Sequence, residues 1–182
     1  MPPASLIVRE CPTVELDVGD LTALRDLMSA AWPGGGFTDD DFEHGLGGRH
    51  WIAELDGDIV SHASAVERPI EVAGRLLRTG YLEAVATLPR LEGQGIGSLV
   101  VAGATEHVRA AYDFGALSTG RHAFYERLGW ERWRGPSFVR TAEGLERTED
   151  DDDGILVLRT PTTPPIDLGA PISCDWRSGD VW

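Results

Sequence analysis

The sequence lacks several features that would place the protein in a specialised class. No apolar run approaches the roughly 20 residues of a membrane-spanning helix, so we expect no contact with a membrane. Only two cysteines are present, Cys11 and Cys174, and they form neither a CxxC pair nor a disulfide framework. The opening MPPASLIVRE has no basic segment followed by a long apolar one, as a secretory signal would. Together these absences predict a protein of the reducing cytoplasm.

Basic residues are also scarce. The chain has 16 Lys and Arg against 30 Asp and Glu, which gives a formal net charge of -14. Neutralising the phosphates of DNA or RNA requires a basic surface, so we expect no nucleic-acid partner. A negative field attracts and steers cationic ligands instead. Charge alone leaves open the simpler interpretation that the acidity serves solubility.

The 182 residues fit one domain of ordinary size, with residues 161–182 forming an extended strap at its end. Residues 5–10 read as a strand, and Asp20 can cap a helix over 21–32. Thr38 can cap a short helix within 38–48. Two hairpins follow, with turns at Asp56-Gly57 and Ala73-Gly74.

The period of the apolar residues then changes. A strand over 81–88 ends at Pro89, and LEGQGIGS leads into an amphipathic helix from Ile96, with Leu99 among its apolar positions. A strand at 115–119, a short helix at 123–130 and two more strands follow, the last two separated by an acidic loop at 146–154. This order predicts a mixed α/β (α+β) fold with a mostly antiparallel twisted sheet flanked by helices.

The segment RLEGQGIGS, residues 90–98, carries the strongest functional signal. Its alternate glycines, Gly93, Gly95 and Gly97, remove Cβ atoms where a backbone must approach another group closely. The helix that follows offers unpaired N–H groups and the positive end of its dipole. A strand, a glycine loop and a helix in this order favour an anion site suited to a diphosphate, over a flexible turn.

Two common phosphate motifs do not fit this loop. A P-loop requires GxxxxGK[ST], and no lysine follows the glycines. A dinucleotide fingerprint requires a third glycine where Ser98 stands, and it normally opens the first βαβ unit.

The pattern Arg90-x-x-Gly93-x-Gly95 resembles the Q/R-x-x-G-x-G/A loop of the GCN5-related N-acetyltransferases. The segment AFYERLGW, residues 123–130, is similar to another motif of that superfamily. The resemblance implies acetyl-CoA as co-substrate. It also implies that the cofactor is held by the strand and loop residues Val85, Ala86, Thr87, Arg90, Gly93, Gln94, Gly95, Ile96, Gly97 and Ser98. The five histidines show no HxxxH or HExxH spacing, so we expect no metal.

Catalytic roles follow from the same resemblance. It implies that Glu83 is the general base, acting through a water, and that the backbone N–H of Val85 stabilises the oxyanion. Tyr125 would donate a proton to the leaving thiolate. Taken without the resemblance, Glu83 could be a salt-bridged strand residue and Tyr125 a core tyrosine.

Further stretches, including FTDDDFEHGLGG, TGYLEAVAT and the terminal CDWRSGDVW, are similar to aminoglycoside 2'-N-acetyltransferases over nearly the whole chain. The resemblance implies acetylation of the 2'-amine of an aminoglycoside in a ternary complex, and a homodimer. It implies a C-terminal strap that folds back into the active site. Substrate amines and hydroxyls would then meet Asp41, Glu83, Ser118, Asp152, Asp180 and Trp182 with its carboxylate.

Several alternatives stay open from the residues. Any of four consecutive aspartates before Gly154 could replace Asp152. An acetyl-cysteine at Cys174 is a second chemical route. The protein could acetylate an endogenous amine, such as a peptide or a cell-wall sugar, or could bind a ligand without catalysis. The family pattern is also disturbed, because residues 118–125 are shorter than expected and Glu92 lies in the glycine loop.

Overall fold

The computed structural model describes residues 5–182 of the chain. The chain forms two compact units. One holds the chain up to Val66 together with Leu82–Thr105, and the other holds Glu67–Tyr81 and Glu106–Trp182. Strands β3 (Asp58–Val72) and β4 (Arg75–Thr87) and helix α3 (Ile96–Ala111) contribute residues to both units.

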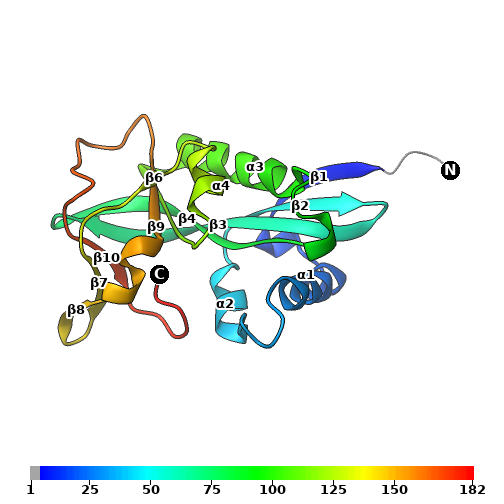
Figure 1. The fold of residues 1–182 in the computed structure, drawn as a ribbon, viewed down its shortest axis with the longest axis horizontal. Coiled ribbons are helices and arrows are strands. Elements are labelled where there is room, and N and C mark those ends of the chain that lie inside the picture. The colour runs from blue at the N-terminus through cyan, green and yellow to red at the C-terminus, as the bar shows by residue number, and fades with distance from the viewer. Residues whose placement is uncertain (1–4) are drawn as a thin grey trace. The chain divides into compact units, whose positions relative to one another are not determined.

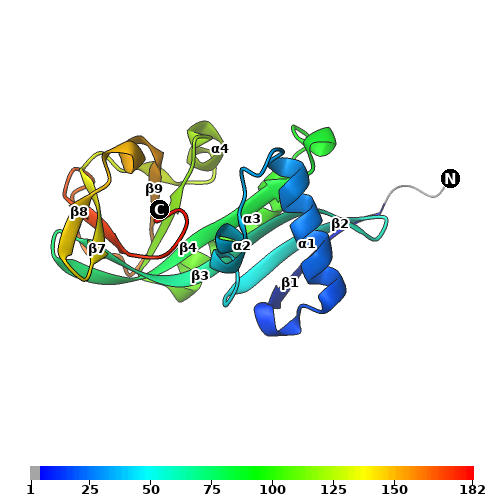
Figure 2. The ribbon, with the colours of Figure 1, turned by 90° about the horizontal axis from the view of Figure 1, so that it is seen from below.

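The first unit is built on strands β1 (Leu6–Pro12) and β2 (Arg49–Leu55) and on residues 58–66 of β3 and 82–87 of β4. β2 pairs antiparallel with both β1 and β3. Helices α1 (Val18–Ala31) and α2 (Asp39–His44) lie on one side of these strands and α3 on the other (Figures 1 and 2). Two 3-10 turns, η1 (Thr13–Glu15) and η2 (Pro89–Leu91), complete it.

Side chains on β2 alternate between two cores because successive residues of a strand point to opposite faces. Ile52 is fully buried in a cluster with Leu24, Leu27 and Met28 of α1. Trp51, its neighbour, lies against Gly103 of α3, where an added Cβ would approach the indole Cδ1 to 2.5 Å. The strand is therefore covered on both faces.

Helix ends agree only partly with the sequence. Thr38 caps α2 as expected, and its side chain accepts a hydrogen bond from the backbone N–H of Asp41. Helix α1 begins three residues earlier than expected, because Asp17 is its N-cap and Asp20 is the third residue of the same capping box. In α3, Leu99 is 51% exposed, so its assignment to the apolar stripe was wrong.

The two hairpin turns are confirmed. Asp56 and Gly57 have φ angles of 54° and 93°, and Ala73 and Gly74 have φ angles of 49° and 79°. Two consecutive positive φ angles are typical of the tight turns whose twist matches that of paired strands.

The second unit is a sheet with the strand order β6-β9-β5-β4-β3-β10-β7-β8. Its additional strands are β5 (Phe114–Ser118), β6 (Glu131–Arg132), β7 (Ser137–Thr141), β8 (Gly144–Arg147), β9 (Ile155–Arg159) and β10 (Ile172–Asp175). Helix α4 (His122–Glu126) and the 3-10 segment η3 (Glu149–Gly154) connect some of them. Fully buried Phe114, Leu156 and Leu158 form part of its core.

Three sequence expectations in this unit need correction. The acidic loop at 146–154 contains the end of β8 and all of η3. Helix α4 ends at Glu126, before the expected boundary. The proline-rich segment is not extended surface throughout, because β10 begins at Ile172 and inserts between β3 and β7 with Ile172, Ser173 and Cys174 buried. Both of its partners are distant in sequence, which is why local patterns missed it.

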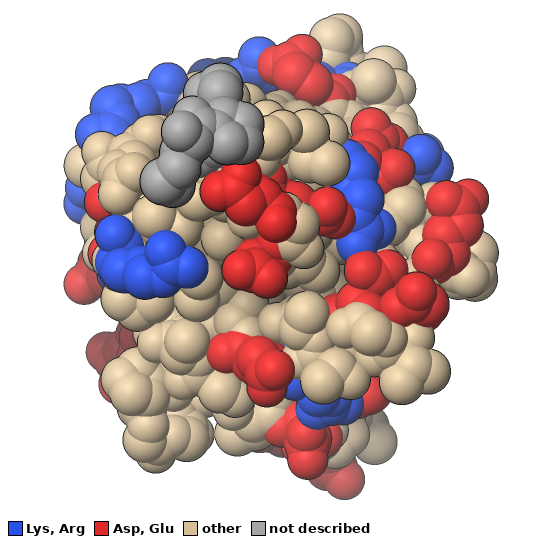
Figure 3. Space-filling model, turned by 90° about the vertical axis from the view of Figure 1, so that its right-hand side faces the viewer, with Lys and Arg blue, Asp and Glu red and all other residues tan. Residues whose placement is uncertain are grey.

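Strand β4 pairs in parallel with β5, and β10 pairs in parallel with β7. The others that pair in register are antiparallel, which confirms the expected mixed fold with a mostly antiparallel sheet. Within residues 5–182, no helix is long and apolar enough to cross a membrane. Acidic side chains are spread over the surface with arginines between them, as the face in Figure 3 shows.

Candidate functional site

The glycine loop has the backbone that its sequence predicts. Gly93 and Gly95 have φ angles of 76° and 84°, a region that residues with a Cβ rarely adopt. A Cβ built at either position would meet no atom within 4 Å, so the space beside both residues is open. The positive φ angles thus explain why glycine stands at both positions. The open space lets a ligand approach the backbone.

Helix α3 begins immediately after this loop, at Ile96. The N–H of Leu99 donates to the carbonyl of Gly95 at 3.3 Å, which is the first hydrogen bond of the helix. The N–H groups that precede it lie in the first turn, where no intrahelical partner exists. Gly97 and Ser98 therefore present donors at the positive end of the helix dipole, an arrangement that suits a phosphate.

Glu83 and Val85 lie on β4, on either side of an unusual backbone position. Ala84 has a φ angle of 48°, although it is not glycine. Such a conformation costs about 1–2 kcal/mol, so surrounding contacts must maintain it. The register of β4 with β5 covers Thr79–Tyr81 only. The strand is therefore distorted where the resemblance places the base and the oxyanion donor.

Tyr125 lies on α4 with 7% of its surface exposed. Its ring packs edge-on against Phe124 and Trp130, with centroids 4.9 and 6.4 Å away. Burial raises the pKa of the Tyr125 phenol, which therefore keeps its proton at neutral pH. A protonated phenol has the right state to act as a proton donor.

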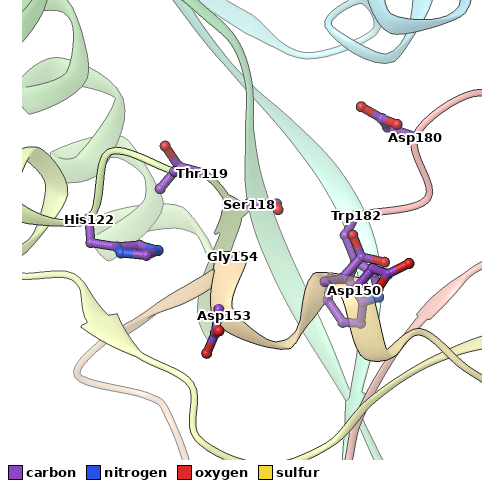
Figure 4. A pocket seen from close by; sticks show the side chains of 10 residues that line it. Ser118, Thr119, His122, Asp150, Asp153, Gly154, Asp180 and Trp182 are labelled. Atoms are coloured by element: carbon purple, nitrogen blue, oxygen red, sulfur yellow. The ribbon is translucent and has the colours of Figure 1, made fainter.

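An acidic pocket of about 350 Å³ lies in the second unit. Figure 4 shows the side chains around it, which come from the end of β5, the start of α4, η3 and the C-terminal tail. They are Ser118, Thr119, Gly120, His122, Asp150, Asp151, Asp153, Gly154, Asp180 and Trp182. The volume lies in the range of small-molecule sites. Three residues proposed to contact substrate, Ser118, Asp180 and Trp182, are thus brought together.

Asp151 shows how the pocket is charged. Its pKa is raised, first by partial burial and then by repulsion from Asp180, Asp150 and Asp152. Carboxylates that raise one another's pKa gain stability when a cation arrives between them. The pocket is therefore suited to a ligand with several ammonium groups.

Asp152 does not line this pocket. Its carboxylate forms a two-pronged ion pair with Arg147 and accepts hydrogen bonds from the backbone N–H and hydroxyl of Ser137 at 2.9 and 2.8 Å. The bond from Arg147 is the main reason that the Asp152 pKa falls to about 2. Of the neighbouring aspartates left open by the sequence, Asp150, Asp151 and Asp153 line the pocket.

Asp41 also has a structural partner, and it belongs to the first unit. Its Oδ2 accepts hydrogen bonds from the N–H and the hydroxyl of Thr38, each at 2.8 Å. It is the third residue of the α2 capping box. The contact of Asp41 with substrate stays a prediction.

The chain's last residues are held by a buried arginine. Arg68, which is 4% exposed, donates to the carboxylate and the carbonyl of Asp175 and to the carbonyl of Val181 at 2.6 Å. The Trp182 ring is buried as well, with 6% of the residue exposed. The tail is therefore packed as part of the second unit, with Asp180 and Trp182 at the pocket.

Cys174 is the cysteine that the sequence places near the proposed active site. Cys174 is fully buried, and burial raises the pKa of its thiol to about 11. Its Sγ lies 3.2 Å from the Val181 carbonyl. A protonated, enclosed thiol is a poor nucleophile, which weighs against an acetyl-cysteine route. Among the described residues, no group of three His, Cys, Asp or Glu side chains could hold a metal.

Sequence reasoning missed Thr119, Gly120, His122 and Gly154 of the pocket, and it left Asp150, Asp151 and Asp153 only as alternatives to Asp152. The run of aspartates indicated an acidic site, but which of them face the pocket depends on the 3-10 turns of η3. His122 gave none, since nothing local shows that it faces the same pocket as residues near 150 and 180.

Comparison with known proteins gives the family. The model of the Acetyltransferase (GNAT) family matches residues 21–130. An aminoglycoside 2'-N-acetyltransferase of Mycolicibacterium fortuitum is 39% identical over 174 residues, which cover 93% of this chain and 89% of that protein. The chain belongs to the GNAT acetyltransferases.

Solved GNAT structures have the same fold. A GNAT family N-acetyltransferase of Escherichia coli, YhbS, in complex with CoA, has a TM-score of 0.66 and 16% identity and covers 96% of this chain and 92% of that one. A GNAT family acetyltransferase of Brucella melitensis in complex with acetyl-CoA has a TM-score of 0.61 and 17% identity, with 89% and 92% covered. At these identities the likeness concerns the fold, and the GNAT fold expected from the sequence is confirmed.

Proposed function

We propose that the protein transfers the acetyl group of acetyl-CoA to the 2'-amino group of aminoglycoside antibiotics and so confers resistance to them. The observation that carries this is the acidic pocket, which joins the C-terminal tail to Ser118 and Asp151. The relative from Mycolicibacterium fortuitum, whose name gives the same activity, supports it. We further infer a cytoplasmic homodimer that uses no metal and binds neither nucleic acid nor membrane.

The glycine loop fits acetyl-CoA, because Gly93 and Gly95 leave open space beside a backbone that carries N–H donors. The N–H groups of residues 93–98 would bind the pyrophosphate, with the positive end of the α3 dipole behind them. The strand residues Val85, Ala86 and Thr87 would lie beside the pantetheine. Acetyl-CoA supplies the thioester, and the protein supplies the groups that orient it.

The chemistry is a direct transfer. The amine nitrogen attacks the thioester carbonyl carbon, and the carbonyl oxygen takes up the negative charge of the tetrahedral intermediate. The N–H of Val85 stabilises that charge. Glu83 accepts the amine proton through a water molecule, and the C–S bond breaks as Tyr125 donates its proton to the sulfur. The products are the amide and CoA with a free thiol.

Substrate selection rests on charge and on hydrogen bonding. An aminoglycoside carries several ammonium groups and many hydroxyls. The carboxylates of Asp151, Asp180 and the Trp182 terminus can pair with the ammonium groups, and Ser118 can bind a hydroxyl. Asp41 and Glu83 are further candidates for substrate contact, whereas the carboxylate of Asp152 forms an ion pair with Arg147.

The experiment is a thiol-release assay with acetyl-CoA and four aminoglycosides. Tobramycin and gentamicin have a 2'-amine, and amikacin and kanamycin A lack it. We expect release with the first pair only, and product analysis should place the acetyl group on the 2'-nitrogen. Equal release with both pairs would refute 2' selectivity. A far higher kcat/KM for a peptide or amino-sugar amine would make the antibiotic a secondary substrate.

A further inference from the structure

A hydrogen-bonded chain of side chains in the first unit leads to the carbonyl of Ala84. The Thr13 hydroxyl lies 2.7 Å from Nε2 of His50, and Nδ1 of His50 lies 2.9 Å from Nε2 of His62. Nδ1 of His62 lies 2.7 Å from the Ala84 carbonyl oxygen. Both imidazoles are buried, with exposures of 0% and 2%. Neither histidine has a role in the proposed reaction.

The donors and acceptors of these hydrogen bonds follow one direction. A carbonyl oxygen only accepts, so Nδ1 of His62 carries the proton, and its Nε2 accepts from Nδ1–H of His50. Nε2 of His50 then accepts from the Thr13 hydroxyl at 2.7 Å, which is nearer than that hydroxyl's other acceptor, the Gly48 carbonyl at 3.2 Å. Burial lowers the pKa of His62 to about 3 and that of His50 to about 4, so both rings are neutral at pH 7. The donors and acceptors of both rings are thereby fully matched.

Thr13, at the other end of these hydrogen bonds, is held by backbone groups of a neighbouring loop. The Thr13 hydroxyl accepts a hydrogen bond from the N–H of Gly47 at 2.8 Å, and the backbone N–H of Thr13 donates to the Gly48 carbonyl at 3.0 Å. Gly48 is packed closely against β3, since an added Cβ there would lie 2.0 Å from the Ala65 carbonyl oxygen. The hydrogen bonds thus run from a closely packed loop to the positive-φ position of β4.

We propose that His62, supported by His50, is a positioning residue that holds the left-handed turn of Ala84 and so aims Glu83 and the N–H of Val85 at the reacting thioester. This inference rests on the proposed function for the roles of Glu83 and Val85. A second side chain of β3 supports the same segment, since the Ser64 hydroxyl donates to the Glu83 carbonyl at 3.2 Å. The side of Ala84 facing Gly45 is filled, with its Cβ 3.1 Å from where a Cβ of Gly45 would lie.

The role differs from that of a catalytic residue, because neither histidine touches a reacting atom in this reading. Their effect is geometric: without the hydrogen bond, the Ala84 carbonyl is free to rotate and Ala84 can return to an ordinary φ angle. The Ala84 carbonyl and the Val85 N–H belong to one peptide unit, so this rotation turns the oxyanion donor. The change of φ at Ala84 also shifts Glu83, which carries the carboxylate. A misplacement of about 1 Å at reacting groups costs on the order of 100-fold in rate.

The test compares His62→Leu with His62→Asn, whose side chains have the same branched arrangement of heavy atoms. The asparagine side-chain N–H₂ lies near the position of Nδ1 and can still donate to Ala84, whereas leucine cannot. Leu24→Val, in the core beneath α1, controls for lost stability without touching the chain. We expect His62→Leu to lower kcat for tobramycin about 100-fold, with both KM values within about threefold. His62→Asn should recover at least tenfold of that loss, and Leu24→Val should leave kcat unchanged.

Equal loss in the leucine and asparagine variants, or a loss in Leu24→Val that follows stability in the same way, would overturn the positioning role. Two readouts do not depend on the amine substrate. Long-range ¹H–¹⁵N spectra at pH 7 should show both rings neutral with the proton on Nδ1, and amide exchange at residues 83–86 should accelerate in His62→Leu alone. A protonated ring, the opposite tautomer or unchanged exchange refutes the inference. If no amine is acetylated by the unmodified protein, the proposed function fails, and these two readouts still decide the histidine chain.

Discussion

The indole Nε1 of Trp182 donates a hydrogen bond to the hydroxyl of Thr148 at 3.0 Å. Thr148 is itself tied to β7, because its backbone N–H donates to the Ser137 carbonyl at 3.1 Å and the two hydroxyls lie 2.8 Å apart. The last residue of the chain is thereby fixed beside η3, which carries the acids of the pocket. The Trp182 side chain thus contributes to packing, and Trp182 and Asp180 both line the pocket.

Removing residues 180–182 should raise the KM for tobramycin at least tenfold, because Asp180 and the terminal carboxylate are lost together. The KM for acetyl-CoA should change less than twofold, since the glycine loop belongs to the first unit. Steady-state kinetics with each substrate varied in turn provides the measurement. Trp182→Phe is the matched control, because it keeps both carboxylates and loses only the bond to Thr148. An unchanged KM in the truncated protein would reduce the tail to a structural element.

Asp151→Asn and Asp152→Asn should separate substrate binding from stability. The first removes a carboxylate of the pocket and should raise the KM for tobramycin several-fold, and the effect should shrink as salt screens the ion pairs. The second breaks the pair with Arg147 and should lower Tm by a few degrees with little change in KM. Asp58→Asn, at the exposed start of β3, is the control for charge. A larger KM effect at 152 than at 151 would reverse the assignment.

Tyr125→Phe should lower kcat about 10- to 100-fold while both KM values stay nearly constant, because a proton donor acts only as the thiolate leaves. The buried ring keeps its packing against Trp130, so the variant should fold normally. Since burial raises the pKa of the phenol, the unmodified protein should show no loss of activity from Tyr125 ionisation below pH 9. Unchanged kcat would assign Tyr125 to the core.

The histidine pair should make stability depend on pH. The folded-state pKa values of His50 and His62, about 4 and about 3, lie below the ordinary value of 6.5. Between pH 6.5 and 4 these two histidines therefore bind protons in the unfolded chain but not in the folded one. Their contribution is complete above pH 6.5 and is lost as pH falls toward 4 and then 3. Urea unfolding should thus show a decline from pH 7 to pH 4.5 that is shallower in His62→Asn, and an equal slope in both would contradict this.

Gly103→Ala should destabilise the protein by about 1–3 kcal/mol, because the added Cβ would lie 2.5 Å from Cδ1 and 2.7 Å from Nε1 of Trp51. The same change in an open helix interior stabilises by up to about 1 kcal/mol, so the sign itself is informative. Chemical denaturation of Gly103→Ala, of Trp51→Phe and of the double variant would give the coupling. Additive effects would show that the two residues do not meet in solution.

Much of the fold was readable from the sequence because its signals are local. The turn residues at 56–57 and 73–74 set the two hairpins through their own φ preferences, and Thr38 set the start of α2. The glycine loop was identified with its correct neighbours, a strand before and a helix after. In each case the residues that decide the structure lie within a few positions of one another, so no distant partner is required.

Tertiary structure decided what depends on residues far apart in the chain. Strand β10 is a strand only because Ile172 pairs with Val72 and Ser137, and no local pattern contains those partners. Asp152 does not line the pocket because Arg147 and Ser137 bind its carboxylate. The hydrogen bonds from Thr13 through His50 and His62 to Ala84 join four segments of the chain. The sequence by itself determined the family and the glycine loop, whereas the directions of buried polar side chains arose only when distant segments packed and each polar group required a partner.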